Sequence, residues 1–224
     1  MLNIIHETKV LIIVNKPAGQ LSQGAKGFDL DLVSEVMTYN ASQGKPAYAA
    51  IINRLDRPVS GLVLIAKNKS AAAKYSTLMQ KEGGFNKQYE ALICGKPSEP
   101  KGTFVDYLKK DGRTNTSAIV PADAAANDKE AKLSKLEYEV ISYDEVKDIT
   151  HVRIHLITGR HHQIRVQFAS RRHPLVGDYK YATADCGMDN AVKAVAFKRN
   201  QIALCAVSLT VDNKTYSVAP EFLL

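Results

Sequence analysis

One carboxylate in the chain stands between two arginines, in the segment Arg54-Leu55-Asp56-Arg57. Neighbouring guanidinium groups favour the ionised form of a carboxyl group. Pro58 restricts the backbone just beyond the acid, and Gly61 permits a tight turn. A rigid loop between two apolar segments suits a carboxylate that is aimed at a reactant. A solvated surface ion pair is the alternative interpretation of the same residues.

A second segment, 151–177, is rich in cations and contains no acidic residue, although the whole chain has 23 acids. Arginine can bind phosphate oxygens through two parallel hydrogen bonds, so this composition indicates a polyanionic ligand. A basic face exposed to solvent is the alternative. The arginines of the segment are Arg153, Arg160, Arg165, Arg171 and Arg172.

The same segment holds five of the six histidines, which raises a metal-site hypothesis that we do not favour. Two of them lie in a strand pattern rather than on a helix, where residues four apart converge, and no paired acidic ligand accompanies them. The chain also has no P-loop, dinucleotide-binding or serine-elbow motif. We therefore expect neither a metal nor a cofactor. The histidines are His151, His155, His161, His162 and His173.

The composition is that of a folded, moderately basic protein. The 224 residues carry a net charge of +7, which is compatible with a nucleic-acid partner. Only three cysteines occur, widely spaced and without a CxxC pair, which favours a reducing compartment. Neither an apolar run of about 20 residues nor a signal-peptide pattern is present, so we expect a cytoplasmic protein without a membrane span.

The hydrophobic pattern predicts an α+β fold, with many strands and few interspersed helices. A helix is predicted at 29–39, where the apolar residues Leu30, Val33 and Met37 stand at the spacing of one helix face, and a helix at 68–82 is expected to have Asn68 as its N-cap. Residues 97–135 look least regular, with a solvated loop at 121–128. Strands are predicted at 10–14, 62–66, 89–94, 136–143, 151–157 and 202–211, and a third, short helix at 162–171.

Five blocks of the sequence resemble, in the same order, motifs of the RluA-type pseudouridine synthases. Residues 52–67, INRLDRPVSGLVLIAK, are similar to the signature HRLDxxTSGLLLxAK of that family. The match spans nearly the whole chain, from residue 10 to about residue 211. The other blocks are VNKPAG at 14–19, KQYEA at 87–91 with Gly95, TGRHHQIRV at 158–166 and HPLVGD at 173–178.

The resemblance implies an enzyme that converts uridine in ribosomal RNA or tRNA to pseudouridine without a metal or cofactor. It also implies a mixed, largely antiparallel sheet with flanking helices and a central active-site cleft. We expect one catalytic domain over residues 1–224, acting as a monomer. The NKPAG turn comes already at residue 15, so we do not expect the small basic RNA-binding module that precedes this turn in many members.

The resemblance also implies roles for individual residues. Asp56 corresponds to the essential aspartate, as nucleophile or as base, and Arg165 to the arginine that ion-pairs with it. Tyr89 corresponds to the tyrosine that stacks on the target base, and Arg54 to the arginine that takes the place of the flipped base. We expect contacts with RNA from Arg54, Arg57, Arg160, His162, Gln163, Arg171 and Arg172.

Four residues depart from the family pattern, and none of them is a predicted catalytic residue: Asn53, Val59, Gln167 and Cys205. Two alternatives from other functional classes stay open. One is a non-catalytic RNA-binding or ribosome-assembly protein on the same fold, which would have no need for Asp56. The other is a metal-dependent RNA hydrolase that uses the histidine cluster.

Overall fold

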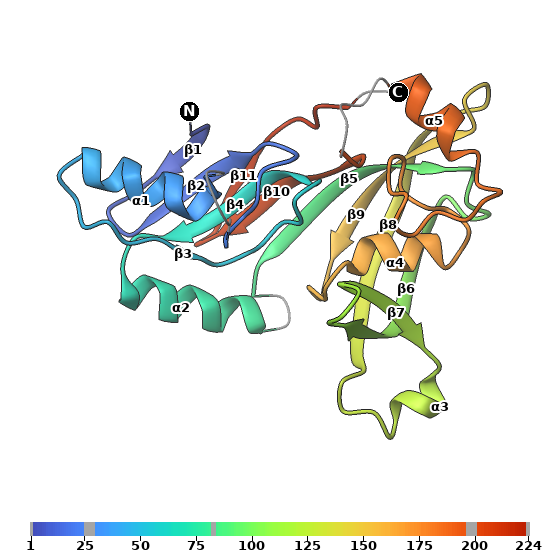
Figure 1. Cartoon of the computed structure of the whole chain (residues 1–224), viewed down its shortest axis with the longest axis horizontal. Coiled ribbons are helices and arrows are strands. Elements are labelled where there is room, and N and C mark those ends of the chain that lie inside the picture. The colour runs from blue at the N-terminus through green and yellow to red at the C-terminus, as the bar shows by residue number, and fades with distance from the viewer. Residues whose placement is uncertain (1, 25–29, 82–83, 196–200, 223–224) are drawn as a thin grey trace. The chain divides into compact units, whose positions relative to one another are not determined.

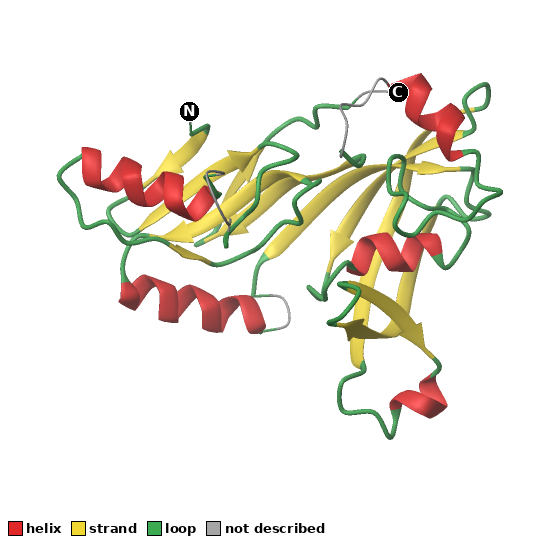
Figure 2. Ribbon diagram, in the orientation of Figure 1, coloured by secondary structure: helices red, strands yellow, loops and turns green. Residues whose placement is uncertain are grey.

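The computed structural model describes residues 2–24, 30–81, 84–195 and 201–222. The chain divides into two compact units, which we call unit 1 (Met1–Asn86 and Cys205–Glu221) and unit 2 (Lys87–Leu204 and Phe222–Leu224). Figures 1 and 2 show the order of the elements and the predominance of strands over helices. Strand pairing is antiparallel with one parallel exception in the described pairs, and the predicted α+β fold is confirmed.

Unit 1 pairs its strands in the order β1-β2-β4-β10-β11, with β3 added against β4. The exception to antiparallel pairing is β4 with β10, where Cys205 and Ala206 face Ser60 and Gly61. The strands are β1 (Ile4–Glu7), β2 (Leu11–Lys16), β3 (Ala50–Ile51), β4 (Ser60–Ala66), β10 (Leu204–Val211) and β11 (Lys214–Ser217), and the helices are α1 (Leu32–Ser42) and α2 (Lys69–Gln80).

Both faces of the central strands of unit 1 are buried. On one face, Ile13 and Leu64 pack with Tyr75 of α2 in a single apolar cluster. The intervening residues, such as Ile12 and Val63, are fully buried as well. This explains why these strands have continuous apolar sequences and are easy to predict.

Helix α2 confirms its prediction, whereas α1 corrects one. Asn68 caps α2 by accepting a hydrogen bond from Ala71 N at 2.8 Å. Helix α1 begins only at Leu32, because Asp31 is its N-cap, and its buried face is Leu32, Val36 and Asn40. Leu30 precedes the helix and is 64% exposed, and Met37 is 37% exposed, so the predicted apolar face was wrong. Residue 29 of the predicted helix lies outside the described residues.

Unit 2 is an antiparallel meander with the strand order β5-β9-β8-β6-β7. Its long strands bury alternate residues, as predicted for Val152, Ile154 and Leu156. On that face, Phe168 of helix α4 contacts the rings of Phe104 and Tyr138 edge-on, with centroids 5.1 and 5.7 Å apart. The elements are β5 (Asn86–Cys94), β6 (Lys101–Asp111), β7 (Thr116–Val120), β8 (Lys132–Asp144), β9 (Ile149–Leu156), α3 (Ala122–Ala125), α4 (Gln163–Ala169) and α5 (Met188–Val195).

The segment 97–135, predicted to be the least regular, contains two strands and a short helix. Strand β6 pairs with eight consecutive residues of β8, from Lys101 with Glu139 to Leu108 with Lys132. It escaped prediction because most of its side chains are exposed or half-buried, so the alternation of apolar and polar residues is weak. Within the predicted solvated loop, Ala125 of α3 is buried. Strands β1, β3 and β11 and helix α5 were also not predicted.

A charged cluster holds β1 to the rest of unit 1. The Glu7 carboxylate accepts hydrogen bonds from Lys67 Nζ, from Lys45 Nζ at 3.0 Å and from Tyr39 Oη at 2.8 Å. The Lys67 side chain is only 4% exposed, so its charge needs this partner. The hydrogen bond from Lys67 is the main cause that lowers the pKa of Glu7 to about 2.

We expect the Glu7 cluster to make stability depend on pH in the acid range. The carboxyl has a lower pKa in the folded chain than the ordinary 4.5, so its contribution is complete above pH 4.5 and is lost as pH falls towards about 2. Denaturant unfolding at pH 6 and pH 3 should therefore show a difference between wild type and Glu7→Gln that shrinks at the lower pH. The matched control is Glu145→Gln, in an exposed turn. A difference independent of pH would contradict the assignment.

Candidate functional site

The Asp56 loop in unit 1 is held on both sides of the carboxylate by the turn after β2. The buried Ser22 hydroxyl donates to Leu55 O at 2.7 Å and accepts from Leu55 N at 3.2 Å. On the other side, Gly19 N donates to Arg57 O at 2.7 Å, and Arg57 Nε donates back to Gly19 O at 2.9 Å. Asp56 itself is half-buried. Its backbone therefore has little freedom, as a site that aims one carboxylate requires.

A buried lysine ties the same two segments together. Lys16 is fully buried, and its ammonium group donates to Pro17 O and Gln20 O at 2.9 Å and to Arg57 O at 3.4 Å. Burial lowers the pKa of Lys16 to about 8, while the negative charge of Asp56 acts in the opposite direction. Sequence analysis missed this residue. Its signal was a lysine at the end of an apolar strand that is buried on both faces.

Asn53, where the family pattern has histidine, fixes the start of the loop. Its side-chain amide donates to Leu62 O at 3.0 Å, and its carbonyl oxygen accepts from Leu64 N at 2.7 Å. At the other end, Gly61 has φ +115°, and a Cβ there would lie 2.4 Å from Ala206 O. Only glycine fits, because the parallel neighbour β10 approaches the backbone so closely.

In unit 2, Lys87 and Tyr89 lie on one face of β5. Both are buried, at 8% and 7% exposure, and Tyr89 pairs with Ile154 of β9. Burial lowers the pKa of Lys87. A Cβ at Gly159 would lie 3.8 Å from Lys87 Nζ, so the TGR block lies beside this lysine. The structure thus brings together two of the resembling blocks, and it adds Lys87, which sequence analysis had not singled out.

Arg165 of α4 forms a buried, two-pronged ion pair with Asp178. Its Nε donates to Oδ2 at 2.7 Å and its Nη2 to Oδ1 at 2.8 Å, with side-chain exposures of 6% and 2%. The guanidinium carbon lies 5.1 Å from the centre of the Tyr181 ring. Sequence analysis had not assigned Asp178 to the site, although it ends the HPLVGD block. The expected pairing of Arg165 with Asp56 stays a prediction, since Asp56 belongs to unit 1.

Two predicted RNA ligands are buried at the start of α4: His162 is the N-cap of the helix and Gln163 is its first residue. Gln163 Oε1 accepts from Thr158 Oγ1 at 2.8 Å and from Arg160 N at 3.0 Å, which closes the TGR loop. His162 has a left-handed backbone with φ 54°, and its Nδ1 lies 2.6 Å from Tyr181 Oη. Both side chains hold the loop in shape, and their contact with RNA stays a prediction.

The segment that is free of acids in sequence is not free of them in space. Glu90 of β5 pairs with His151 and Arg153, each at 3.1 Å, and Glu137 of β8 lies 3.4 Å from His155. Further along, Asp106 of β6 pairs with Arg171 at 3.0 Å. The predicted RNA ligands that are exposed are Arg54, Arg57, Arg160 and Arg172.

No group of three or more histidine, cysteine, aspartate or glutamate side chains could hold a metal ion within ranges 2–24, 30–81, 84–195 and 201–222. Over the same ranges, no helix is both long and apolar enough to cross a membrane.

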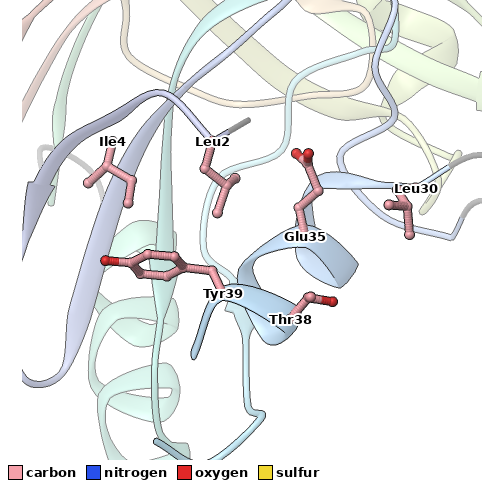
Figure 3. A pocket seen from close by; sticks show the side chains of 6 residues that line it. All are labelled: Leu2, Ile4, Leu30, Glu35, Thr38 and Tyr39. Atoms are coloured by element: carbon pink, nitrogen blue, oxygen red, sulfur yellow. The ribbon is translucent and has the colours of Figure 1, made fainter. Parts of the chain in front are cut away.

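An open pocket of about 320 Å³ lies between β1 and α1 in unit 1. Figure 3 shows the Tyr39 ring beside Ile4, and Glu35 beside Leu2. Glu35 Oε2 accepts a hydrogen bond from Gln20 Nε2 at 2.8 Å. None of the predicted site residues is among those that line the pocket, which are Leu2, Ile4, Leu30, Glu35, Thr38 and Tyr39.

Comparison with known proteins agrees with the motifs and with the fold. Residues 10–170 match the family model described as RNA pseudouridylate synthase, and the chain belongs to this family. It is 29% identical over 206 residues to ribosomal large subunit pseudouridine synthase D of Zymomonas mobilis, covering 90% of this chain and 62% of the relative. It is 33% identical over 178 residues to ribosomal large subunit pseudouridine synthase C of Rickettsia bellii, covering 80% and 56%. The chain thus spans little more than half the length of these curated relatives.

The fold is that of solved pseudouridine synthase domains. Human RNA pseudouridylate synthase domain containing 1 matches with a TM-score of 0.74 at 23% identity, covering 99% of this chain and 84% of the human one. Human RNA pseudouridylate synthase domain containing 4 matches with a TM-score of 0.75 at 19% identity, covering 97% and 88%. The family and fold implied by the five sequence blocks are therefore confirmed.

Arg171 and Arg172 are adjacent, but we expect the first to matter for stability and the second for RNA binding. The Arg171 guanidinium donates to both oxygens of Asp106, at 3.0 and 3.2 Å, and lies 3.9 Å from the centre of the Phe104 ring. Arg171→Ala should lower the free energy of unfolding by about 1–3 kcal/mol. Arg172→Ala, at an exposed position, should change it by less than about 0.5 kcal/mol.

The salt dependence of RNA binding should change in Arg172→Ala but not in Arg171→Ala. Arg172→Ala should reduce the slope of log affinity against log salt concentration by about one unit, as expected for one lost phosphate contact. At a temperature where Arg171→Ala is folded, its slope should match that of the wild type. Thermal melts and salt titrations of both variants are the measurements, with Arg172→Lys as the control that keeps the charge. A lost slope in Arg171→Ala with unchanged stability would reverse the assignment.

Proposed function

We propose that this chain isomerises uridine in RNA to pseudouridine, with Asp56 as the essential carboxylate. The observation that carries the proposal is the double restraint on the Asp56 loop, through Ser22 and Gly19, in a chain of the RNA pseudouridylate synthase family. The names of its relatives, which refer to the ribosomal large subunit, favour ribosomal RNA over tRNA as the substrate.

The reaction breaks the N1–C1′ glycosidic bond and forms a C5–C1′ bond. The freed base turns between the two events; C5 then loses a proton, and N1 gains one, so no oxidant or reductant is consumed. Asp56 acts either as a nucleophile on C1′ or as a base that takes a sugar proton. An ionised carboxylate serves both routes, and neither needs a metal or cofactor.

The other residues that match the family motifs have roles around the flipped base. A uridine in a helix must leave the stack, at a cost of a few kcal/mol, before Asp56 can reach its sugar. Arg54, which is exposed, fills the vacated place in the RNA. The Tyr89 ring stacks on the uracil and its hydroxyl helps to move a proton, while Arg165 is the ion-pair partner of Asp56.

We propose that both units contribute to one catalytic domain over residues 1–224, because Asp56 belongs to unit 1 and Tyr89 and Arg165 belong to unit 2. The domain acts as a monomer in the cytoplasm. Its partner is RNA, bound through the exposed arginines, and it takes neither a small-molecule cofactor nor a metal.

Asp56→Asn should abolish pseudouridine formation while leaving folding and RNA binding nearly intact. The substitution keeps the size of the side chain but removes its charge, and with it both the nucleophile and the base. Loss of a catalytic nucleophile costs on the order of 10⁶ in rate. Tritium release from RNA labelled with 5-³H-uridine measures the loss, and thermal melts and filter binding check the fold.

The matched control for Asp56→Asn is Glu145→Gln, which neutralises an exposed acid in the turn between β8 and β9. It should release tritium at the wild-type rate. Substantial release by Asp56→Asn would remove Asp56 from the reaction, because no other carboxylate occupies this position of the family signature.

Tyr89→Phe should keep the affinity for RNA but slow turnover. The ring can still stack on uracil, whereas the hydroxyl can no longer pass a proton. The loss of a general acid or base costs about 10²–10⁴-fold in rate. Single-turnover tritium release at saturating enzyme separates the chemical step from binding. Wild-type turnover in this variant would restrict Tyr89 to packing on β5.

A further inference from the structure

We propose that Asp178 and Tyr181 are positioning residues that orient the Arg165 guanidinium for catalysis. The inference rests on the proposed function, in which Arg165 acts on Asp56. It assigns a role to a cluster that lies within unit 2 and joins three segments: the start of α4, strand β7 and the loop after Gly177.

The first support is the geometry of the ion pair. Arg165 uses Nε and Nη2 for the two Asp178 oxygens, at 2.7 and 2.8 Å. Two parallel hydrogen bonds fix both the plane of the guanidinium and its rotation within that plane. The direction in which the third nitrogen, Nη1, donates is thereby set before any substrate binds.

The second support is that the pair is fully desolvated. The exposures of the two side chains, 6% and 2%, leave no room for solvent to replace Asp178 as a partner. A guanidinium buried without its carboxylate would rotate towards another acceptor or draw in water. The orientation of Arg165 therefore depends on Asp178 rather than on the general charge of the region.

The third support is the way Tyr181 braces the pair. Its ring lies 5.1 Å from the Arg165 guanidinium carbon, and its hydroxyl accepts from Ser117 N at 2.9 Å and lies 2.6 Å from His162 Nδ1. His162 in turn stacks on His161 at 3.8 Å, and His161 Nδ1 lies 2.9 Å from Ser117 Oγ. The network connects the helix that carries Arg165 to strand β7.

The functional consequence is preorganisation. A charged donor lowers a barrier most when it already points to where charge develops, since no reorganisation is then needed during the reaction. A misplacement of about 1 Å can cost about 10²-fold in rate. Loss of Asp178 should therefore appear in kcat, because the step that uses Arg165 is slowed, and much less in KM, because the Asp178 side chain is buried.

The chain offers a matched control in the same unit. Asp106 forms a second two-pronged pair with an arginine, Arg171, which also lies over an aromatic ring, that of Phe104. If two-pronged ion pairs of this kind only stabilise the fold, Asp106→Asn and Asp178→Asn should both leave kcat unchanged. If Asp178 positions Arg165, only Asp178→Asn should lower kcat.

The experiment compares wild type, Asp178→Asn, Asp106→Asn and Tyr181→Phe below their melting temperatures, with 5-³H-uridine ribosomal RNA from cells that lack this gene. We expect kcat to fall about 10²-fold in Asp178→Asn and less in Tyr181→Phe, with KM changed by no more than a factor of about three in each. Asp106→Asn should melt at a lower temperature but keep its kcat. Tyr181→Phe keeps the test decisive if Asp178→Asn does not fold.

Chemical rescue distinguishes a positioning role of Asp178 from a purely structural one. Ethylguanidinium at millimolar concentration should restore part of the activity of Arg165→Ala, because Asp178 still binds and orients a guanidinium. It should not restore the double variant Arg165→Ala/Asp178→Asn. Equal rescue of both variants, or an unchanged kcat in Asp178→Asn and Tyr181→Phe, would overturn the positioning role alone. A wild-type chain that releases no tritium would overturn the proposed function and, with it, this inference.

Discussion

The position of the Asp56 loop depends on the hydrogen bonds that the buried ammonium group of Lys16 donates. A charge taken out of water needs several good acceptors, and the carbonyls of Pro17, Gln20 and Arg57 are the ones it has. These carbonyls belong to two segments that are 40 residues apart in sequence, so meeting the needs of one lysine draws both segments together. The half-buried Asp56 lies in the segment so restrained, and its negative charge is one of the two that favour the ionised lysine.

In unit 2, acids of neighbouring strands offset the excess of cations in segment 151–177. The register of the strands does this, since Glu90 of β5 lies opposite Arg153 of β9 and Glu137 of β8 lies opposite His155. Acids from neighbouring strands thus neutralise cations that have no acid near them in sequence. A smaller set of exposed arginines is left to bind a polyanion. The fold, through its ion pairs, determines which arginines these are.

The sequence predicts most where a residue acts through its own neighbours along the chain. The Asn68 cap, the apolar strands β2 and β4 and the alternation of β9 are of this kind, and all three are confirmed. The family blocks locate Asp56, Tyr89 and Arg165, whose joint action stays a prediction. Sequence analysis failed where partners are distant, as with Lys16, and where the alternation is weak, as in β6. The α1 face was missed because Asp31, a residue expected inside the helix, is its cap.

The parallel pairing of β4 with β10 has a consequence for the order in which the chain can acquire its structure during synthesis. Gly61 of β4 has no side chain, so Ala206 can approach its backbone closely. The ribosome adds the whole of the continuous segment Lys87–Leu204 after Gly61 and before Ala206. At about 5–20 residues per second, a ribosome needs roughly 6 to 24 s for that interval. Unit 2 is a nearly continuous stretch and can fold as it emerges, whereas the Ser60–Gly61 end of β4 must wait for its partner strand β10. Because synthesis runs from the N-terminus to the C-terminus, the unit that carries Asp56 is the last to complete its sheet.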